Sequence, residues 1–168
     1  MMVRHSLRYE EHNVEYTQII HDGFVDKTEW AGFLTGADRL ALESHPYLAF
    51  SGFNNDSLQS QITRPCQYWA NTYNQSMAAG FWTSAGEWSL AVNDCGEYVN
   101  GVNQGSHYDG TYAGSSQVYG NCAEWTDYTT WDDTMKGYLR SMALAYMDMS
   151  RNWAFWSALA LRFRLECR

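Results

Sequence analysis

The sequence is poor in basic residues. Only 11 of its 168 residues are Lys or Arg, against 19 Asp and Glu, which gives a formal net charge of -8 with His neutral. No run of basic residues interrupts this acidic pattern. A surface that follows phosphate groups needs clustered Lys and Arg, so we expect no nucleic-acid partner.

Long apolar segments and prolines are also scarce. No apolar stretch approaches the roughly 20 residues of a membrane span, and the first residues, MMVRHSLRYEEH, contain no hydrophobic signal core. We therefore expect no membrane span and no signal peptide in this chain. Proline occurs only twice and glycine is scattered, so no linker divides the chain and residues 1–168 are expected to form one unit.

Cysteine is present without a metal-binding pattern. The four cysteines are Cys66, Cys95, Cys122 and Cys167. Their spacings match no zinc motif, and no His lies close enough in sequence to complete one. We expect no bound metal and no cofactor. Disulfide bonds are the favoured explanation, and they imply an oxidising compartment such as the extracellular space.

Aromatic residues, in contrast, make up 16% of the chain, with 8 Trp and 12 Tyr. This exceeds what a plain core needs. Flat rings with a polar edge suit sugars and protein interfaces alike, so aromatic content alone does not choose between these two kinds of ligand.

Four short apolar runs predict buried strands at residues 15–24, 38–50, 78–88 and 152–157. Each leads from β-branched or aliphatic residues into a polar or His-containing end, as in a strand with its chemistry at the C-terminal tip. Helices are predicted in part of residues 58–73, over 89–102, and over 131–150, where Asp132 and Asp133 provide the cap and a first-turn acid.

The alternation of strand and helix predicts a parallel α/β fold whose site lies at the C-terminal edge of the strands. A closed eight-stranded barrel needs at least about 200 residues, more than the 168 present. The chain is therefore either a smaller open α/β domain or part of a barrel.

One glutamate stands out within SAGEWSLAVNDC, residues 84–95, where Glu87 lies between Gly86 and Trp88. An isolated Glu is usually a solvated charge, because acids are seldom buried. A rigid strand end can equally hold a reactive carboxylate. His45, followed by Pro46, is on its own more often a structural histidine than a functional one.

Five motifs favour a functional role for Glu87 and His45, because they occur together and in one order. They are IIHDGF, SHPYLAF, AGEWSLAVNDC, YVNGVNQGSHYDGTY and NWAFWS. In this order and at these spacings the chain resembles fungal exo-β-1,3-glucanases of glycoside hydrolase family five. The resemblance covers about residues 15–157, and residues 158–168 diverge from it. It implies a (β/α)8 TIM barrel, of which this α/β chain is a partial barrel corresponding to strands five to eight.

The same resemblance implies a retaining glycoside hydrolase that cleaves β-1,3-glucan and releases glucose by double displacement. Glu87 matches the nucleophile at the end of the seventh strand. His45 and Tyr47 match a His-x-Tyr motif that ends the sixth strand, where the Tyr hydroxyl faces the nucleophile and the His helps to hold the sugar. A Tyr O–H suits this place because it can donate to a carboxylate and keep it ionised.

Substrate-binding residues are implied in the same way. Phe50 corresponds to an aromatic residue at the cleft entrance, although a role in the core stays open. Trp156 matches the eighth-strand Trp that floors the subsite of cleavage, where an indole face can pair with the C–H face of glucose. His21 and Asp22, at the end of the fifth strand, are further candidates for lining the cleft.

Cysteine pairing also follows from the resemblance. Cys95 and Cys122 match a pair that spans the loop after the seventh strand, so we expect them to be bonded to each other. Cys66 matches a cysteine whose partner lies near the normal C-terminus, and Cys167 need not replace that partner. The full-length family is extracellular or attached to the cell wall.

The general acid/base of this family, a Glu within Asn-Glu-Pro, has no counterpart in the sequence. Glu10 and Glu11 lack the flanking Asn and Pro. Without leaving-group protonation we expect hydrolysis to be impaired by about 10²–10⁴-fold. We also expect a truncated product that self-associates through exposed sheet edges. A catalytically silent carbohydrate-binding or structural remnant, and an enzyme for another β-glucan or a glycolipid, stay open as alternatives.

Overall fold

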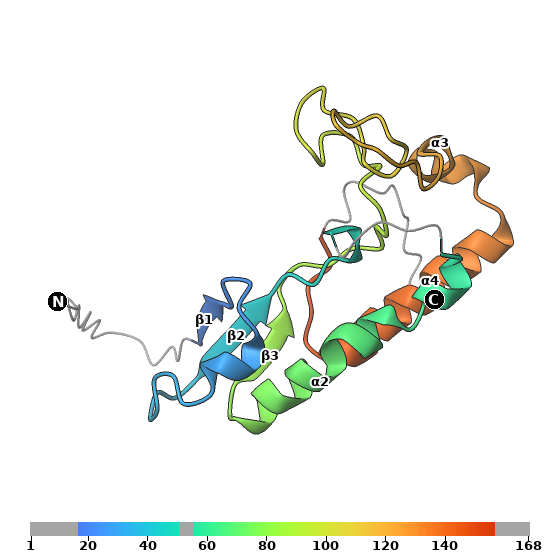
Figure 1. Ribbon diagram of the computed structural model, residues 1–168. Coiled ribbons are helices and arrows are strands. Elements are labelled where there is room, and N and C mark those ends of the chain that lie inside the picture. Colours follow the sequence, from blue (N-terminus) through green and yellow to red (C-terminus); the bar gives the residue numbers. More distant parts are fainter. Residues whose placement is uncertain (1–16, 51–55, 157–168) are drawn as a thin grey trace, which may run out of the picture.

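The fold is built on a sheet of three parallel strands. In the computed structural model, which describes residues 17–50 and 56–156, β1 (Gln18–His21), β2 (Leu40–Ser44) and β3 (Trp82–Ala85) lie side by side in this order (Figure 1). His21 lies opposite Glu43, and Glu43 lies opposite Ser84. Because the strands are parallel, their C-terminal ends meet at one edge of the sheet.

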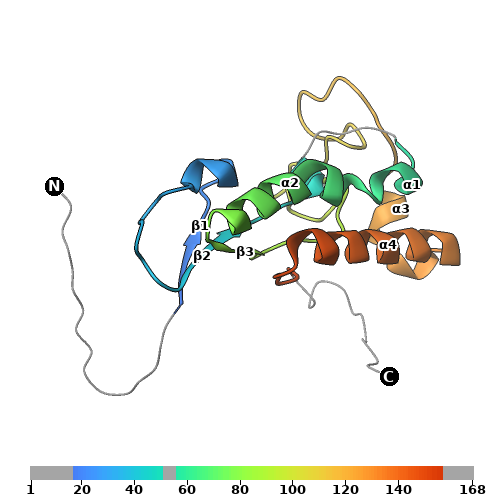
Figure 2. The same ribbon diagram turned by 90° about the horizontal axis from the view of Figure 1, so that it is seen from below.

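Two long helices, α2 (Arg64–Ala78) and α4 (Asp133–Ser150), lie side by side in both views of the chain (Figures 1 and 2). The Asp132 side chain accepts a hydrogen bond from the Met135 backbone N at 2.7 Å and so caps α4. The described residues also form shorter elements: η1 (Lys27–Trp30), η2 (Leu48–Phe50), α1 (Leu58–Gln61), α3 (Ala123–Thr126) and η3 (Tyr128–Thr130). None of the helices in the described ranges is long and apolar enough to cross a membrane.

The core lies where α2, α4 and the end of β3 meet. Trp88 is 1% exposed and stacks on Tyr146 of α4, with ring centroids 4.8 Å apart. Tyr73 of α2 and Met142 of α4 are fully buried in the same cluster. Close packing around Trp88 fixes the backbone of the residue that precedes it.

Three of the four predicted strands and the predicted helix at 131–150 are present, as α4, β1, β2 and β3. At residues 152–156 the chain runs beside β3 but forms only an isolated parallel bridge between Trp153 and Ala85. Ser157 and the divergent tail, with Cys167, lie outside the described residues. The coarse prediction of a parallel α/β fold is confirmed, and the arrangement is compatible with part of a barrel.

The predicted helix over 89–102 was wrong, because this stretch belongs to a long loop without a helix. The Asn93 side chain accepts a hydrogen bond from the Cys95 backbone N at 3.2 Å, which competes with helical bonding. Tyr98 and Gly101 have positive φ angles of 66° and 107°, values that an α-helix does not use. Polar turn chemistry therefore outweighs the apolar periodicity here.

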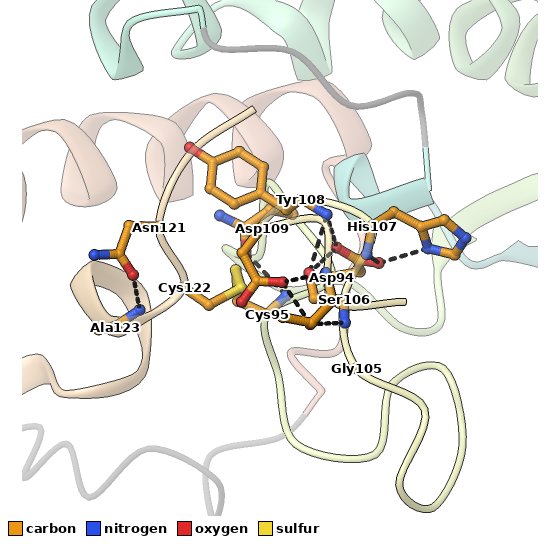
Figure 3. Close-up of a disulfide and its surroundings, with 12 residues drawn as sticks. Asp94, Cys95, Gly105, Ser106, His107, Tyr108, Asp109, Asn121, Cys122 and Ala123 are labelled. Atoms are coloured by element: carbon orange, nitrogen blue, oxygen red, sulfur yellow. Dashed lines mark hydrogen bonds and ion pairs between the residues drawn. A yellow bond between two sulfur atoms is a disulfide. The ribbon is translucent and has the colours of Figure 1, made fainter. Parts of the chain in front are cut away.

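Asp94 organises this loop from its centre (Figure 3). It is 1% exposed and accepts hydrogen bonds from Ser106 Oγ at 2.6 Å, Asn100 Nδ2 at 2.7 Å and the His107 backbone N at 2.8 Å. Burial raises the pKa of this carboxyl, but the hydrogen bonds from Ser106, Asn100 and His107 outweigh burial and hold the pKa well below its usual range. Next to it a disulfide joins Cys95 to Cys122, the pair that the resemblance implied.

Candidate active site

The polar ends of the three strands converge at the C-terminal edge of the sheet. Glu87 follows β3, His45 and Tyr47 follow β2, and His21 ends β1. Most of the residues singled out in the sequence therefore come from separate strands and meet in space. Their convergence follows from parallel strand order, which places each strand end beside its neighbour.

Glu87 and Tyr47 are in direct contact. The Tyr47 hydroxyl donates a hydrogen bond to Glu87 Oε2 at 3.0 Å. Burial raises the pKa of Tyr47, and the hydrogen bond to Glu87 raises it further. Tyr47 is thus kept as a neutral donor, and the carboxylate, with a side chain that is 32% exposed, keeps access to solvent.

His45 lies between two carboxylates. Its Nδ1 is 3.5 Å from Glu87 Oε2, and its Nε2 is 3.2 Å from Glu43 Oε1. These two contacts, one at each ring nitrogen, fix the orientation of the imidazole. Glu43 was not among the residues selected from the sequence. Its signal was available, since a residue two positions before His45 along a strand faces the same side.

Gly86 makes this arrangement possible. Its backbone N donates to the Ser44 carbonyl oxygen at 2.9 Å, which ties the segment before Glu87 to β2. A Cβ built on Gly86 would overlap Oε2 of Glu43. The Gly-Glu sequence therefore lets one carboxylate pass over the backbone that carries the other.

Trp156 and Phe50 are exposed near this edge. Trp156 is 60% exposed, and its backbone N donates to the Trp88 carbonyl oxygen at 2.9 Å. Phe50 is 66% exposed, and its ring centroid lies 6.1 Å from that of Tyr47. The side chain of Phe50 is therefore not buried in the core, and its role at the cleft entrance stays a prediction.

A pocket of about 450 Å³ opens at the C-terminal ends of β1 and β2. His45 and Tyr47 line it from the β2 side, and Tyr68 and Trp69 line it from α2. Asp22 also lines it, but this residue is 3% exposed and pairs with Lys27 at 3.3 Å. Asp22 is thus a buried structural ion-pair partner as well as part of the pocket wall.

One group of side chains could hold a cation. His21, Glu43 and His45 each offer a ligand atom, and these atoms lie within 4.8 Å of one another. His21 is also packed edge to face against His45, with ring centroids 4.5 Å apart. Sequence reasoning missed this group because its members come from two strands.

Comparisons with known proteins agree with the motifs. No protein-family model matches the chain. A glucan 1,3-beta-glucosidase of Lachancea kluyveri is 31% identical over 148 residues, covering 82% of this chain and 33% of that protein. One of Blumeria graminis is 30% identical over 151 residues, covering 82% and 34%. A glucan 1,3-beta-glucosidase 2 of Wickerhamomyces anomalus is 32% identical over 149 residues, covering 83% and 34%. The chain spans about a third of the length of these curated relatives.

Proposed function

The chain is a relative of the fungal glucan 1,3-beta-glucosidases that corresponds to about a third of their length, and from this premise we propose that it carries the nucleophile side of a β-1,3-glucan hydrolase. Glu87 is the proposed nucleophile of a retaining, double-displacement reaction. The observation that supports this role best is the 3.0 Å hydrogen bond from Tyr47 to Glu87, joined by His45 on the other side.

The first step of this reaction needs an ionised carboxylate in a fixed position. Glu87 Oε attacks the anomeric carbon, the bond to the leaving oxygen breaks, and a glycosyl ester forms. Tyr47 and His45 hold the carboxylate through the hydrogen bond and the ring contact already described. Buried Trp88 fixes the adjacent backbone, because a site on a rigid strand end is held more tightly than one on a free loop.

The general acid is the second requirement, and we propose that it comes from outside this sequence. A retaining enzyme places its two carboxyl groups about 5–5.5 Å apart. The 168 residues contain no Asn-Glu-Pro, so hydrolysis of ordinary glucosides by this chain alone is expected to be slow. Strands β1, β2 and β3 then correspond to strands five to seven of a barrel, with residues 152–156 in the eighth position.

Sugar binding is assigned to the exposed aromatic residues. Trp156 is 60% exposed and Phe50 is 66% exposed, so both rings are accessible to a sugar. Phe50 precedes the proposed nucleophile in the sequence, and Trp156 follows it. A pyranose C–H face stacks well on such rings. The disulfide supports secretion to the extracellular space or cell wall, because disulfides form and persist in oxidising compartments.

Self-association is part of the same proposal. β1 is at the edge of the described sheet, and its Ile19 side chain is 62% exposed. An unpaired parallel edge with an apolar side chain readily pairs with another chain. Sedimentation velocity at rising protein concentration should show dimers or larger species, and a monomer throughout would contradict this part.

A 2-fluoro-glucosyl fluoride tests the nucleophile alone, because fluoride leaves with little help from an acid. Attack by Glu87 breaks the C–F bond, releases fluoride and leaves a long-lived glucosyl ester. Intact mass and peptide mapping should place the adduct on Glu87. The Glu87→Gln variant should give none, and the matched variant Glu97→Gln, at an exposed acid in the distant loop, should label like the unchanged chain.

The absence of labelling in a sample that circular dichroism shows to be folded would reject Glu87 as a working nucleophile. The missing Asn-Glu-Pro favours one alternative in that case, a carbohydrate-binding or structural remnant that holds glucan without cutting it. Calorimetric binding of a β-1,3-glucan oligosaccharide without release of glucose would support that alternative.

A further inference from the structure

Two histidines and one glutamate converge beside Glu87. His21 ends β1, Glu43 lies in β2 opposite His21, and His45 follows β2. One ligand atom from each of the three side chains lies within 4.8 Å of the other two. All three residues are partly exposed, so the cluster lies near the surface.

The spacing within this group is that of ligands around a small cation. His45 Nε2 and Glu43 Oε1 are 3.2 Å apart. Ligands bound at about 2.0–2.2 Å in a tetrahedral zinc site lie about 3.3–3.5 Å from one another. His21 Nε2 is buried and has no hydrogen-bond partner in the described structure. A buried polar atom without a partner is costly, and a bound cation would satisfy it.

Carboxylates also stand behind both rings. His45 Nδ1 is 3.5 Å from Glu87 Oε2, and His21 Nδ1 is 3.8 Å from Asp22 Oδ1. Metal-binding histidines usually donate their second ring N–H to such a group. At present the Gly23 backbone N donates to His21 Nδ1 at 2.9 Å, which leaves the ring hydrogen on Nε2. A cation bound at Nε2 would require this hydrogen to be on Nδ1 instead. The Nδ1–H would then face the Asp22 carboxylate, and the hydrogen bond from the Gly23 backbone N would be lost.

We propose that His21, Glu43 and His45 bind one Zn²⁺ or a similar first-row divalent cation. Two imidazoles and a carboxylate form a known three-ligand zinc set that leaves a fourth position for water. The nitrogen ligands favour zinc, cobalt or nickel over magnesium and calcium, which prefer oxygen ligands. The site does not depend on the proposed hydrolysis, and its occupancy can be measured without any substrate.

The test uses the full chain, freed of metal with a chelator and dialysed. Calorimetry should show one equivalent of Zn²⁺ bound, and Co²⁺ should give the visible absorption bands of a four-coordinate ion. His21→Ala and Glu43→Gln each remove a ligand. Loss of a residue that only contacts a metal ligand typically lowers metal affinity 10- to 100-fold. Because His21 and Glu43 are themselves ligands in the proposal, we expect each variant to bind Zn²⁺ at least about 100-fold more weakly.

His107→Ala is the matched control, because His107 lies in the loop held by Asp94 and outside this cluster. It should bind Zn²⁺ like the unchanged chain, and Mg²⁺ and Ca²⁺ should not compete. Circular dichroism must show the same fold in all variants. Unchanged Zn²⁺ affinity in both His21→Ala and Glu43→Gln would overturn the proposal, as would loss of binding in His107→Ala or no binding by the unchanged chain.

Discussion

The Tyr47→Phe substitution tests the contact on which the proposed nucleophile depends. It removes only the hydroxyl that donates to Glu87 Oε2 at 3.0 Å and keeps the ring beside Phe50. A hydrogen bond to a charged group contributes about 1.5–3 kcal/mol. With about 1.4 kcal/mol for each factor of ten, the rate of covalent labelling by the fluorosugar should fall about 10- to 150-fold.

The assay follows adduct formation on Glu87 by intact mass over time at several fluorosugar concentrations. Tyr68→Phe is the control, since Tyr68 lines the same pocket as Tyr47, is 46% exposed and lies on α2. It should label at the rate of the unchanged chain. Equal rates for Tyr47→Phe and the unchanged chain, with equal circular dichroism spectra, would refute the role assigned to this hydroxyl.

Four further predictions concern stability, measured by urea unfolding. Gly86→Ala should destabilise the chain by about 1–3 kcal/mol, because the new methyl overlaps the Glu43 carboxylate. Gly137→Ala should stabilise it by about 0.5–1 kcal/mol, because Gly137 is at an exposed position of α4 where a Cβ meets no other atom. Asp94→Asn should cost about 3 kcal/mol near neutral pH. Because the pKa of Asp94 is depressed by folding, its stabilisation is present above about pH 4 and is lost as pH falls further, so the variant should show a weaker acid dependence than the unchanged chain. Reduction of the Cys95–Cys122 bond, which spans 27 residues, should lower the unfolding free energy by about 3–4 kcal/mol; no change in the urea midpoint with reductant would contradict this.

Strand positions and the convergence of their ends could be predicted from the sequence. Apolar runs that finish in polar residues gave β1, β2 and β3, and a cap signal at Asp132 gave the start of α4. Parallel order then required the strand ends to meet, which brings His45 and Tyr47 to Glu87. These features depend on local pattern and on one general rule of sheet topology.

Other features could not be predicted because they depend on contacts between distant residues. The loop around Asp94 takes its shape from donors at residues 100–108, so its apolar spacing misleadingly resembled that of a helix. Glu43 became part of the site only because Gly86 leaves room for its carboxylate. His21 meets His45 through strand register, and no spacing along the chain encodes that register.

The disulfide also has a consequence for how fast the chain folds. The core stack joins Trp88 to Tyr146, and the intervening chain must close a long loop before this contact forms. The Cys95–Cys122 bond lies within that loop and shortens it by 27 residues, which roughly halves it. Halving a loop lowers the closure cost by about 0.6 kcal/mol, so the oxidised chain should bring α4 onto the sheet about threefold faster than the reduced chain.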